Sequence, residues 1–367
     1  MSDDLRVPTP RASSGAARVS HGPCVLLKHG EVFLKGRNRH RFTERLHDNL
    51  RVSLRGVGGS TWIKTAQNVT VLGGHVPVEA LVERARRVVG FNSVEPTVRV
   101  PSTLDGITAA AIDALRAVSG VRRGLRFAVR VRRRDKQFPL TSSRMEVFLG
   151  ARVLDAVPAL TVDLTTPDVT LNVVIDHKET YLSCERLPGL SGLPVGTSGR
   201  ALVLLSGGYD SPVAAHRAMR RGLACDFVHF NGAPYTNPSS VYKAYALARE
   251  LNRCQPPGTL HVVALAVDEA AALPVLRPLI GWEKQEIIDE ARSIGTAGIS
   301  VLPDEDCCSL LAPPRVSTGA RLPHLRSVEK RLDLEEVVEA LLGSAQVLRP
   351  GEDEEAPVSG DGCPAPA

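Results

Sequence analysis

Residues 202–212 read LVLLSGGYDSP, an apolar run followed by two glycines and, four residues later, a proline. Leu202 to Leu205 form a continuous apolar segment, which predicts a strand buried on both faces, as in a parallel sheet. Gly207 and Gly208 allow the backbone to turn tightly and to approach a ligand without intervening side chains. Pro212 suits the first turn of a helix, because its missing N–H costs nothing there. The stretch therefore predicts a strand, a tight loop and a helix in succession.

This loop has the features of a phosphate-binding site. The start of the helix offers unpaired N–H groups and a partial positive charge to an anion. Ser206 and Ser211 add hydroxyl donors, and the carboxylate of Asp210 is a candidate ligand for Mg2+. No Gly-Lys-Ser/Thr follows, so the loop is not a Walker loop. A glycine turn that merely joins a strand to a helix is the alternative, and the strand–loop–helix context favours phosphate binding over it.

The sequence after the loop extends the same architecture. Its apolar patterns predict, in order, a helix, a strand, a helix and a strand over residues 212–221, 225–230, 239–252 and 260–265. Alternating strands and helices predict an open, doubly wound α/β domain. His229 and Phe230 end the second strand, at the edge of such a sheet where ligands bind. A strand-end histidine that simply meets solvent is an equally good interpretation of His229.

Two smaller α+β modules precede this domain. In the first, Phe42, Leu46 and Leu50 recur every four residues and predict one apolar helix face. In the second, residues 125–132 read LRFAVRVR, so that apolar residues alternate with mostly basic ones. This alternation predicts a strand with one apolar face and one strongly basic face.

The basic strand lies in a region with one sign of charge. Residues 122–136 hold eight Arg or Lys residues and one acid, Asp135. Phosphate contacts from such a surface position RNA without reading its sequence, whereas a merely solvated face is the alternative. The candidate RNA-binding residues are Lys35, Arg37, Arg39, Arg126, Arg130, Arg132, Arg133, Arg134 and Lys136.

The composition limits the classes of function. The chain is 43% hydrophobic and 23% charged, as globular proteins are, and its formal net charge of +5 does not by itself indicate a polyanion partner. Residues 1–20 lack the apolar core of a secretory signal, and no apolar run approaches the roughly 20 residues of a membrane helix. We therefore expect a cytoplasmic protein with no membrane partner. None of the seven cysteines lies in a Cys-x-x-Cys pair, so a zinc site is not expected.

Several stretches together resemble one family. SGGYDS is similar to the SGGxDS loop of the PP-loop pyrophosphatases, which cleave ATP between its α and β phosphates. Motifs of the tRNA 4-thiouridine synthetases are similar to the stretches LPGLSGLPVGTSG, HGEVFLKGRNR, VRVRRRDKQFP, LRPLI and PDEDCC, at residues 187–199, 29–39, 129–139, 276–280 and 303–308. Because they follow the family order over most of residues 24–322, the chain is identified as a member of that family.

The resemblance implies a fold. A PP-loop domain with a doubly wound parallel sheet would follow a ferredoxin-like domain and a THUMP domain, both α+β, and the rhodanese extension of some members is absent. The expected divisions are a disordered tail, the ferredoxin-like domain, the THUMP domain, a linker, a shortened PP-loop domain, a C-terminal helix and a second disordered tail, over residues 1–20, 21–80, 81–186, 187–200, 201–325, 326–343 and 344–367.

The resemblance also implies an activity. ATP, with Mg2+, would adenylate O4 of uridine 8 in tRNA, and a cysteine persulfide would displace AMP to give 4-thiouridine. The sulfur would come from a cysteine desulfurase, with a side role that passes sulfur to the thiamine sulfur-carrier protein. Cys307 occupies the position of the sulfur-handling cysteine, and Cys308 either resolves a disulfide or is a bystander; two small residues that fill a gap are the alternative for the pair. The implied catalytic residues are Cys307, Cys308 and Asp210, and the implied ATP-binding residues are Leu204, Leu205, Ser206, Gly207, Gly208, Asp210, Ser211, His229 and Phe230.

One part of the family pattern is missing. Only residues 267–275 separate the predicted strand that ends near Ala266 from Leu276, whereas a parallel crossover needs a dozen residues or more. In the family this place holds a basic helix, another strand and a loop that contacts the nucleotide. Three explanations are open: a degenerated homologue, an error in the gene prediction, or a pocket rebuilt in another way, such as across a homodimer. The competing functions are a tRNA-binding protein with impaired catalysis and another PP-loop adenylating enzyme.

Overall fold

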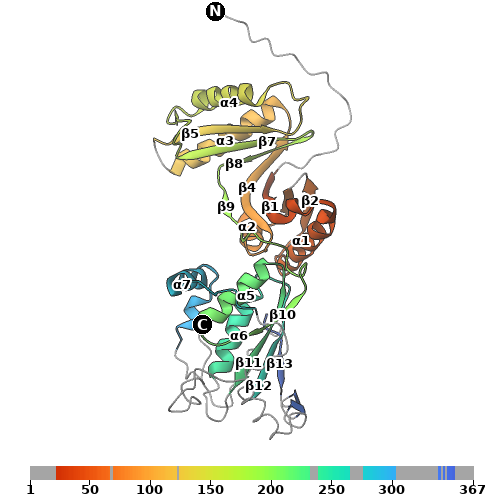
Figure 1. The fold of residues 1–367 in the computed structure, drawn as a ribbon. Coiled ribbons are helices and arrows are strands. Elements are labelled where there is room, and N and C mark those ends of the chain that lie inside the picture. The colour runs from red at the N-terminus through yellow and green to blue at the C-terminus, as the bar shows by residue number, and fades with distance from the viewer. Residues whose placement is uncertain are drawn as a thin grey trace, which may run out of the picture. The chain divides into compact units, whose positions relative to one another are not determined.

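The computed structural model describes residues 22–66, 69–121, 124–231, 239–264, 276–302, 338–339, 342–343 and 345–351. The chain divides into two compact units (Figure 1). The first comprises residues up to Leu26 together with Glu95–Arg186, and the second comprises Leu27–Val94 together with Leu187 onward.

The first unit is a sheet covered by two helices. Its strands lie in the order β4-β8-β7-β5-β6, where β5 runs parallel to β6 and β7, and β8 runs antiparallel to β4 and β7. The bounds are β4 Phe91–Pro101, of which residues 95–101 belong here, β5 Arg126–Arg133, β6 Thr161–Val162, β7 Val169–Ile175, β8 Glu179–Ser183, α3 Leu104–Val121 and α4 Ser142–Ala156. Helix α4 packs against β5 and α3 against β8, in one core.

The predicted alternation along β5 is confirmed. Phe127, Val129 and Val131 are buried in the core of this unit, whereas Arg126, Arg130 and Arg132 are exposed. Ala128 is also buried, although it lies on the basic side of the alternation. The strand therefore has one apolar face against the helices and one basic face toward solvent.

The second unit begins with a small α+β module. It holds the end of β1 (Gly22–His29), the short helix η1 (Glu31–Asn38), α1 (Arg39–Ser53), the antiparallel pair β2 (Thr61–Ala66) and β3 (Val69–Gly74), and α2 (Val78–Arg86). Leu46 and Leu50 of α1 are fully buried, as the spacing predicts. The predicted boundary between residues 80 and 81 falls inside α2. Because α2 packs against α1 and β3, it belongs with this module.

The PP-loop part of the second unit is a four-stranded sheet in the order β10-β11-β12-β13. The strands β10 (Arg200–Leu204), β11 (Ala224–Asn231) and β12 (Leu260–Ala264) are parallel, and β13 (Gln346–Leu348) pairs antiparallel with β12. The helices are α5 (Asp210–Arg220), α6 (Ser239–Leu251), α7 (Lys284–Ser293) and α8 (Ala297–Ser300). The predicted alternation of strands and helices over residues 200–264 is confirmed.

Two expectations for this sheet were wrong. Leu202 and Leu204 are 60% and 66% exposed, so β10 is not buried on both faces. The reason is that β10 pairs with β11 alone within the described residues, and only Ala201 and Val203 on its other face pack against the core. The expected C-terminal tail, 344–367, contains the strand β13, because the free edge of β12 offers it backbone hydrogen-bonding partners. Most of the expected helix over 326–343 lies outside the described residues.

A buried polar network lies inside the small α+β module. The Nε2 atoms of His29 and His47 each lie 2.8 Å from Oγ1 of Thr70. Burial, followed by the nearby His47 and Arg39, lowers the pKa of His29 from 6.5 to about 4. Burial likewise lowers the pKa of His47. Both imidazoles are therefore held neutral at pH 7.

We expect this network to make the module sensitive to acid. A histidine with a folded pKa of about 4 binds its proton more readily when the chain is unfolded, so stability is full above pH 6.5 and is lost as pH falls toward 4. The loss for His29 is about 3 kcal/mol at most. Urea unfolding followed by Trp62 fluorescence at pH 7 and pH 4.5 measures it. His29→Gln should flatten the pH dependence, and the exposed His40→Gln should not; equal profiles for the two variants would contradict the assignment.

Candidate functional site

The predicted phosphate loop joins β10 to α5 and is open to solvent. Ser206 and Gly208 are exposed. The hydroxyl of Ser211 lies 3.0 Å from both the amide N and the Oγ of Ser206, which closes the turn. The amides of Gly207 and Tyr209 make no hydrogen bond to another described residue. They therefore leave donors at the N-terminus of α5, where the helix dipole favours an anion.

The space over Gly208 is also free of described side chains. A Cβ added to Gly208 would meet no protein atom closer than the Oγ of Ser206, at 3.7 Å. On its other side the loop is anchored, because Ser300 Oγ donates a hydrogen bond to the carbonyl of Gly208 at 3.2 Å. A phosphate can therefore approach Gly208 without displacing a side chain of the described residues.

The carboxylate of Asp210 is paired with a lysine that the sequence analysis did not select. Lys284 Nζ lies 2.6 Å from Asp210 Oδ1 and 5.8 Å from the centre of the Tyr209 ring. Lys284 is the first residue of α7, which a capping box of Glu283 and Glu286 starts. Both charged partners are more than half exposed, so the pair contributes little to stability. The ion pair matters for position, because it holds the ammonium of Lys284 at the mouth of the glycine turn.

Helix α7 is held against α5 by a buried ionic cluster. Glu290 accepts a hydrogen bond from His216 Nδ1 at 2.9 Å and pairs with Arg217. Burial alone would raise the pKa of Glu290, but its hydrogen bonds with His216 and Arg217 outweigh burial and lower it. The guanidinium of Arg217 also stacks on Trp282, 3.8 Å from the ring centre. These contacts fix the position of Lys284 relative to the loop.

Glu290→Ala is expected to destabilise this packing by about 3 kcal/mol, because it leaves the buried His216 and the half-buried Arg217 without their carboxylate. Urea unfolding followed by Trp282 fluorescence, in a Trp62→Phe background, reports on α7 directly. Asp289→Ala, on the exposed side of the same helix, is the matched control and should change stability by less than about 0.5 kcal/mol. Similar losses for the two variants would rule out a special role of Glu290.

His229 and the flanking residues lie beneath the loop. His229 is buried, its Nδ1 lies 2.9 Å from the carbonyl oxygen of Leu205, and its Nε2 lies 3.3 Å from Ser240 Oγ. Leu205 is also buried, whereas Leu204 is exposed and Phe230 is half-buried. The structure thus shows His229 tying β11 and α6 to the entrance of the loop. Direct contact of these four residues with ATP stays a prediction.

The basic face of β5 is partly neutralised within the protein. Arg126 pairs with Asp163 and Asp168, and Arg134 pairs with Asp176. Arg130 donates to the carbonyl of Leu164 at 2.7 Å and Arg133 to that of Phe138 at 3.0 Å. Within residues 124–186, Arg132 and Lys136 have no such partner and are exposed. They are the cations of this set most available to an RNA phosphate.

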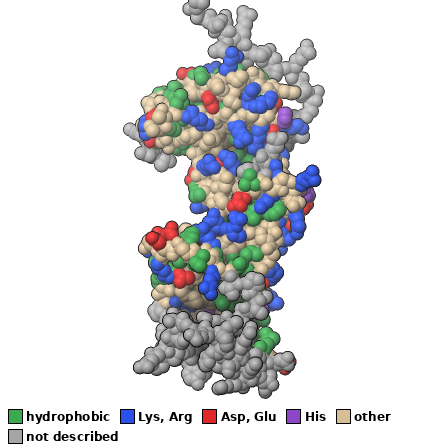
Figure 2. All heavy atoms as spheres, in the orientation of Figure 1, with side chains coloured by type: hydrophobic (Ala, Val, Ile, Leu, Met, Phe, Trp, Pro, Cys, Tyr) green, Lys and Arg blue, Asp and Glu red, His purple; other side chains and the backbone are tan. Residues whose placement is uncertain are grey.

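The remaining RNA-binding candidates lie in η1 and at the first residue of α1. Arg37 is exposed, and Lys35 and Arg39 are half-buried. Lys35 lies 5.4 Å from the centre of the Phe42 ring, which holds its ammonium in place. Figure 2 shows Lys and Arg side chains at the surface of both units. RNA binding by these residues stays a prediction.

The described cysteines are unsuited to nucleophilic chemistry. Cys24, Cys184, Cys225 and Cys254 are free thiols. Burial raises the pKa of Cys225 to about 12 and that of Cys184 to about 11, so both remain protonated at neutral pH. Cys225 lies in the core of the second unit. Cys307 and Cys308 lie outside the described residues.

The parallel sheet, with a glycine turn at the start of α5 and no Walker lysine, defines a protein of the PP-loop class. Family models match in the same sense: the ThiI ferredoxin-like domain at residues 24–94, the THUMP domain at 101–185, and the thiamine biosynthesis protein ThiI at 196–267 and 257–334. A probable tRNA sulfurtransferase of Nocardia farcinica is 47% identical, over 90% of this chain and 95% of that protein. The chain therefore belongs to the tRNA sulfurtransferase family.

Other relatives agree. A probable tRNA sulfurtransferase of Bacillus subtilis is 30% identical, over 90% of this chain and 97% of that protein. The crystal structure of a 4-thiouridine synthetase–RNA complex with bound ATP matches with a TM-score of 0.78 at 24% identity, over 89% of this chain and 99% of that one. A Pyrococcus horikoshii protein matches with a TM-score of 0.63 at 23% identity, over 75% of this chain and 100% of that one. These two structures establish the likeness of fold.

The comparisons also confirm that a segment present in the relatives is missing from this chain. The alignment with the Nocardia relative has 393 positions but covers 90% of 367 residues, which is about 330, so about 60 aligned positions have no residue in this chain. The match to the ThiI model is correspondingly broken into two pieces that meet at residues 257–267. This is the place where β12 ends and the short connection to α7 begins.

Among the described residues, no helix is both long enough and apolar enough to cross a membrane.

Proposed function

We propose that this chain is an ATP-dependent tRNA uracil 4-sulfurtransferase that converts uridine 8 of tRNA to 4-thiouridine. The observation that carries the proposal is the open glycine turn at the start of α5, with Lys284 beside it and with the amides of Gly207 and Tyr209 making no hydrogen bond to another described residue. Membership of the tRNA sulfurtransferase family supports the substrate and the transferred atom. The fold shared with the ATP-bound 4-thiouridine synthetase supports the same arrangement of parts.

The proposed chemistry has two steps. In the first, O4 of the uridine attacks the α-phosphorus of ATP, and pyrophosphate leaves. The amides of Gly207 and Tyr209 and the ammonium of Lys284 would offset the charge of the phosphates at this stage. Mg2+ would neutralise phosphate charge further, and Asp210 is the carboxylate placed to bind it in exchange for its contact with Lys284.

In the second step sulfur replaces the adenylated oxygen. The terminal sulfur of a persulfide on Cys307 attacks C4 of the uridine, and AMP leaves with O4. A cysteine desulfurase would supply the persulfide sulfur, and the same sulfur could pass to the carrier protein of thiamine synthesis. Cys308 would then attack Cys307 to release the sulfur as a disulfide forms. These roles rest on the resemblance of PDEDCC, at residues 303–308, to the family motif.

The second candidate is a tRNA-binding protein with impaired catalysis. About 60 positions of the relatives have no counterpart here, and the exposed Leu202 and Leu204 lie on β10, the strand that leads into the loop. The catalytic proposal therefore requires another source for the missing wall of the nucleotide pocket. A second copy of the chain in a homodimer is our candidate for that source.

Mass spectrometry of tRNA from a deletion strain tests the proposal. The wild-type chain should restore 4-thiouridine, and a nucleotide titration should show ordinary micromolar affinity for ATP. If the chain binds tRNA, but does not bind ATP and does not restore 4-thiouridine to the deletion strain, the impaired homologue is the correct description. If tRNA binding is absent as well, both candidates fail.

A further inference from the structure

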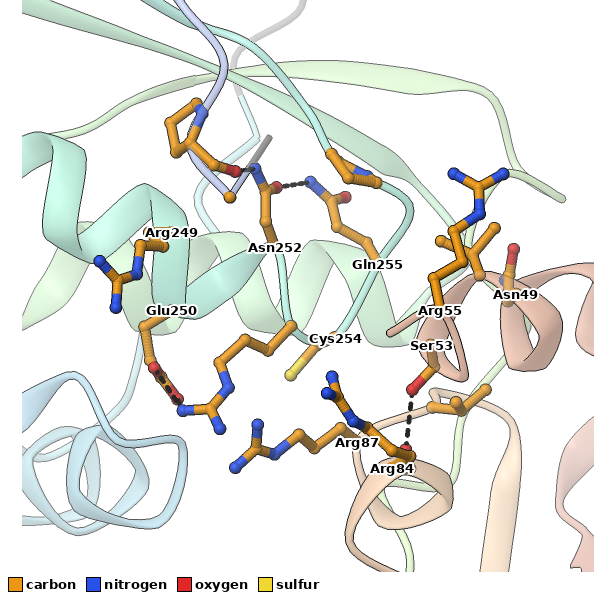
Figure 3. Close-up of a pocket in the computed structure, with 16 residues that line it drawn as sticks. Asn49, Ser53, Arg55, Arg84, Arg87, Arg249, Glu250, Asn252, Cys254 and Gln255 are labelled. Atoms are coloured by element: carbon orange, nitrogen blue, oxygen red, sulfur yellow. Dashed lines mark hydrogen bonds and ion pairs between the residues drawn. The ribbon is translucent and has the colours of Figure 1, made fainter. Parts of the chain in front are cut away.

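A cavity of about 510 Å³ lies within the second unit, on a side of the fold that the proposed chemistry does not use (Figure 3). It forms where α1, α2 and α6 end. The lining contains one acid, Glu250, and the five arginines Arg55, Arg84, Arg87, Arg249 and Arg253. We propose that this cavity, the arginine pocket, binds backbone phosphates of the tRNA substrate; the proposal rests on the proposed function.

The pocket is distinct from the glycine turn. Helix α6 begins at the end of the sheet that carries the glycine turn, where Ser240 contacts His229. It then runs for 13 residues, which is roughly 20 Å, and its last turn carries Arg249 and Glu250 into the pocket. A ligand in the pocket is therefore a separate contact and not an extension of the nucleotide site.

The charge of the pocket exceeds what the local structure needs. Glu83 pairs with Arg87 at 3.1 Å and with Arg253 at 3.7 Å, and Glu250 also pairs with Arg253, at 2.9 Å. Five arginines against these two acids leave three positive charges, and the three helix C-termini would offset only about half of that. Among the described residues, the side chains of Arg55 and Arg84 make no ion pair with a carboxylate, and Arg249 interacts with Glu250 only electrostatically, without a direct ion pair. An external anion would supply the negative charge that these arginines lack.

The other polar groups favour a phosphate over a base. The amides of Asn49, Asn252 and Gln255 are already used: they donate to the carbonyls of Val195, Gly258 and Pro350, and Cys225 respectively. No lining residue is aromatic, so a nucleobase would find no ring to stack on. Arg55, Arg249 and Arg253 are exposed at the rim, as a continuous backbone requires. The pocket therefore suits contacts that position RNA without reading its sequence.

The test is binding of a fluorescent tRNA transcript to the full chain, measured by anisotropy over a range of salt. Arg55→Gln with Arg249→Gln removes two exposed cations and should weaken binding about tenfold, and the slope of log K against log salt should fall by about 1 to 2. Arg55→Lys with Arg249→Lys should keep most of the affinity. Arg86→Gln with Arg292→Gln, which removes two exposed arginines outside the pocket, is the matched control and should change binding less than twofold.

The outcomes separate the two levels of the proposal. If the wild-type chain binds tRNA and the pocket variant binds as tightly as the control variant, the pocket assignment is wrong and the proposed function stands. If the wild-type chain binds no tRNA, both fail. Calorimetry with inorganic pyrophosphate distinguishes a small anion: binding that disappears in the pocket variant, with tRNA affinity unchanged, would overturn the RNA assignment.

Discussion

Replacing Cys307 with serine is expected to lower 4-thiouridine formation by at least about 10³-fold, because a serine oxygen cannot carry the sulfur that attacks C4. The adenylation step should survive, since it uses the glycine turn and Lys284. Pyrophosphate release in the presence of tRNA and ATP should therefore stay within a few-fold of the wild-type rate. The second step is measured separately: a cysteine desulfurase delivers radiolabelled sulfur to the chain, and the label that reaches the tRNA is counted.

Cys308→Ser is the matched control for this change. It removes the same chemical group from the neighbouring residue, so any general effect on folding should be shared. We expect it to allow the attack on C4 but to leave the tRNA linked to Cys307 through a disulfide, so that 4-thiouridine is released in a single turnover only when an external thiol is added. If Cys308→Ser formed no 4-thiouridine even with added thiol while Cys307→Ser remained active, the roles assigned to the two thiols would be reversed.

Replacing Lys284 with glutamine is expected to slow pyrophosphate release by about 10² to 10³-fold, because it removes a cation placed at the mouth of the glycine turn. The effect should fall on adenylation and leave the affinity for tRNA unchanged. Lys284→Arg keeps the charge and should recover part of the rate. The measurement is single-turnover pyrophosphate release at saturating tRNA.

Lys178→Gln serves as the control for loss of one exposed lysine charge and should have no effect on this rate. If Lys284→Gln binds ATP and releases pyrophosphate as fast as the wild-type chain does, the ion pair with Asp210 is only a surface contact. In that case the glycine turn alone would have to account for phosphate stabilisation.

Much of the fold could be predicted because its signals are local. The apolar periods of α1 and of β5, and the strand–loop–helix order over residues 200–264, depend on residues a few positions apart. Lys284 was missed because its position beside Asp210 depends on contacts 74 residues apart in sequence. Its only local signal was its place at the start of an amphipathic helix.

The arginine pocket shows the same limit. Its cations come from the ends of three helices that are far apart in sequence, and none of them lies in a charge run that the sequence analysis selected. The exposure of Leu202 and Leu204 is likewise a property of the assembled sheet, since it depends on which neighbours β10 has. A continuous apolar run predicts burial only when both faces and both edges of the strand are covered.

By itself, the sequence determined the glycine turn, the alternation along the basic strand, the tandem thiols and the family, because each is written in short runs of residue types. It also revealed the missing segment, because only residues 267–275 separate the predicted strand that ends near Ala266 from Leu276. Only the tertiary structure decided that Lys284 meets Asp210, that Glu290 locks α7 to α5, and that five arginines share one cavity. The physical reason is that such contacts join distant parts of the chain, and packing, not local spacing, brings those parts together.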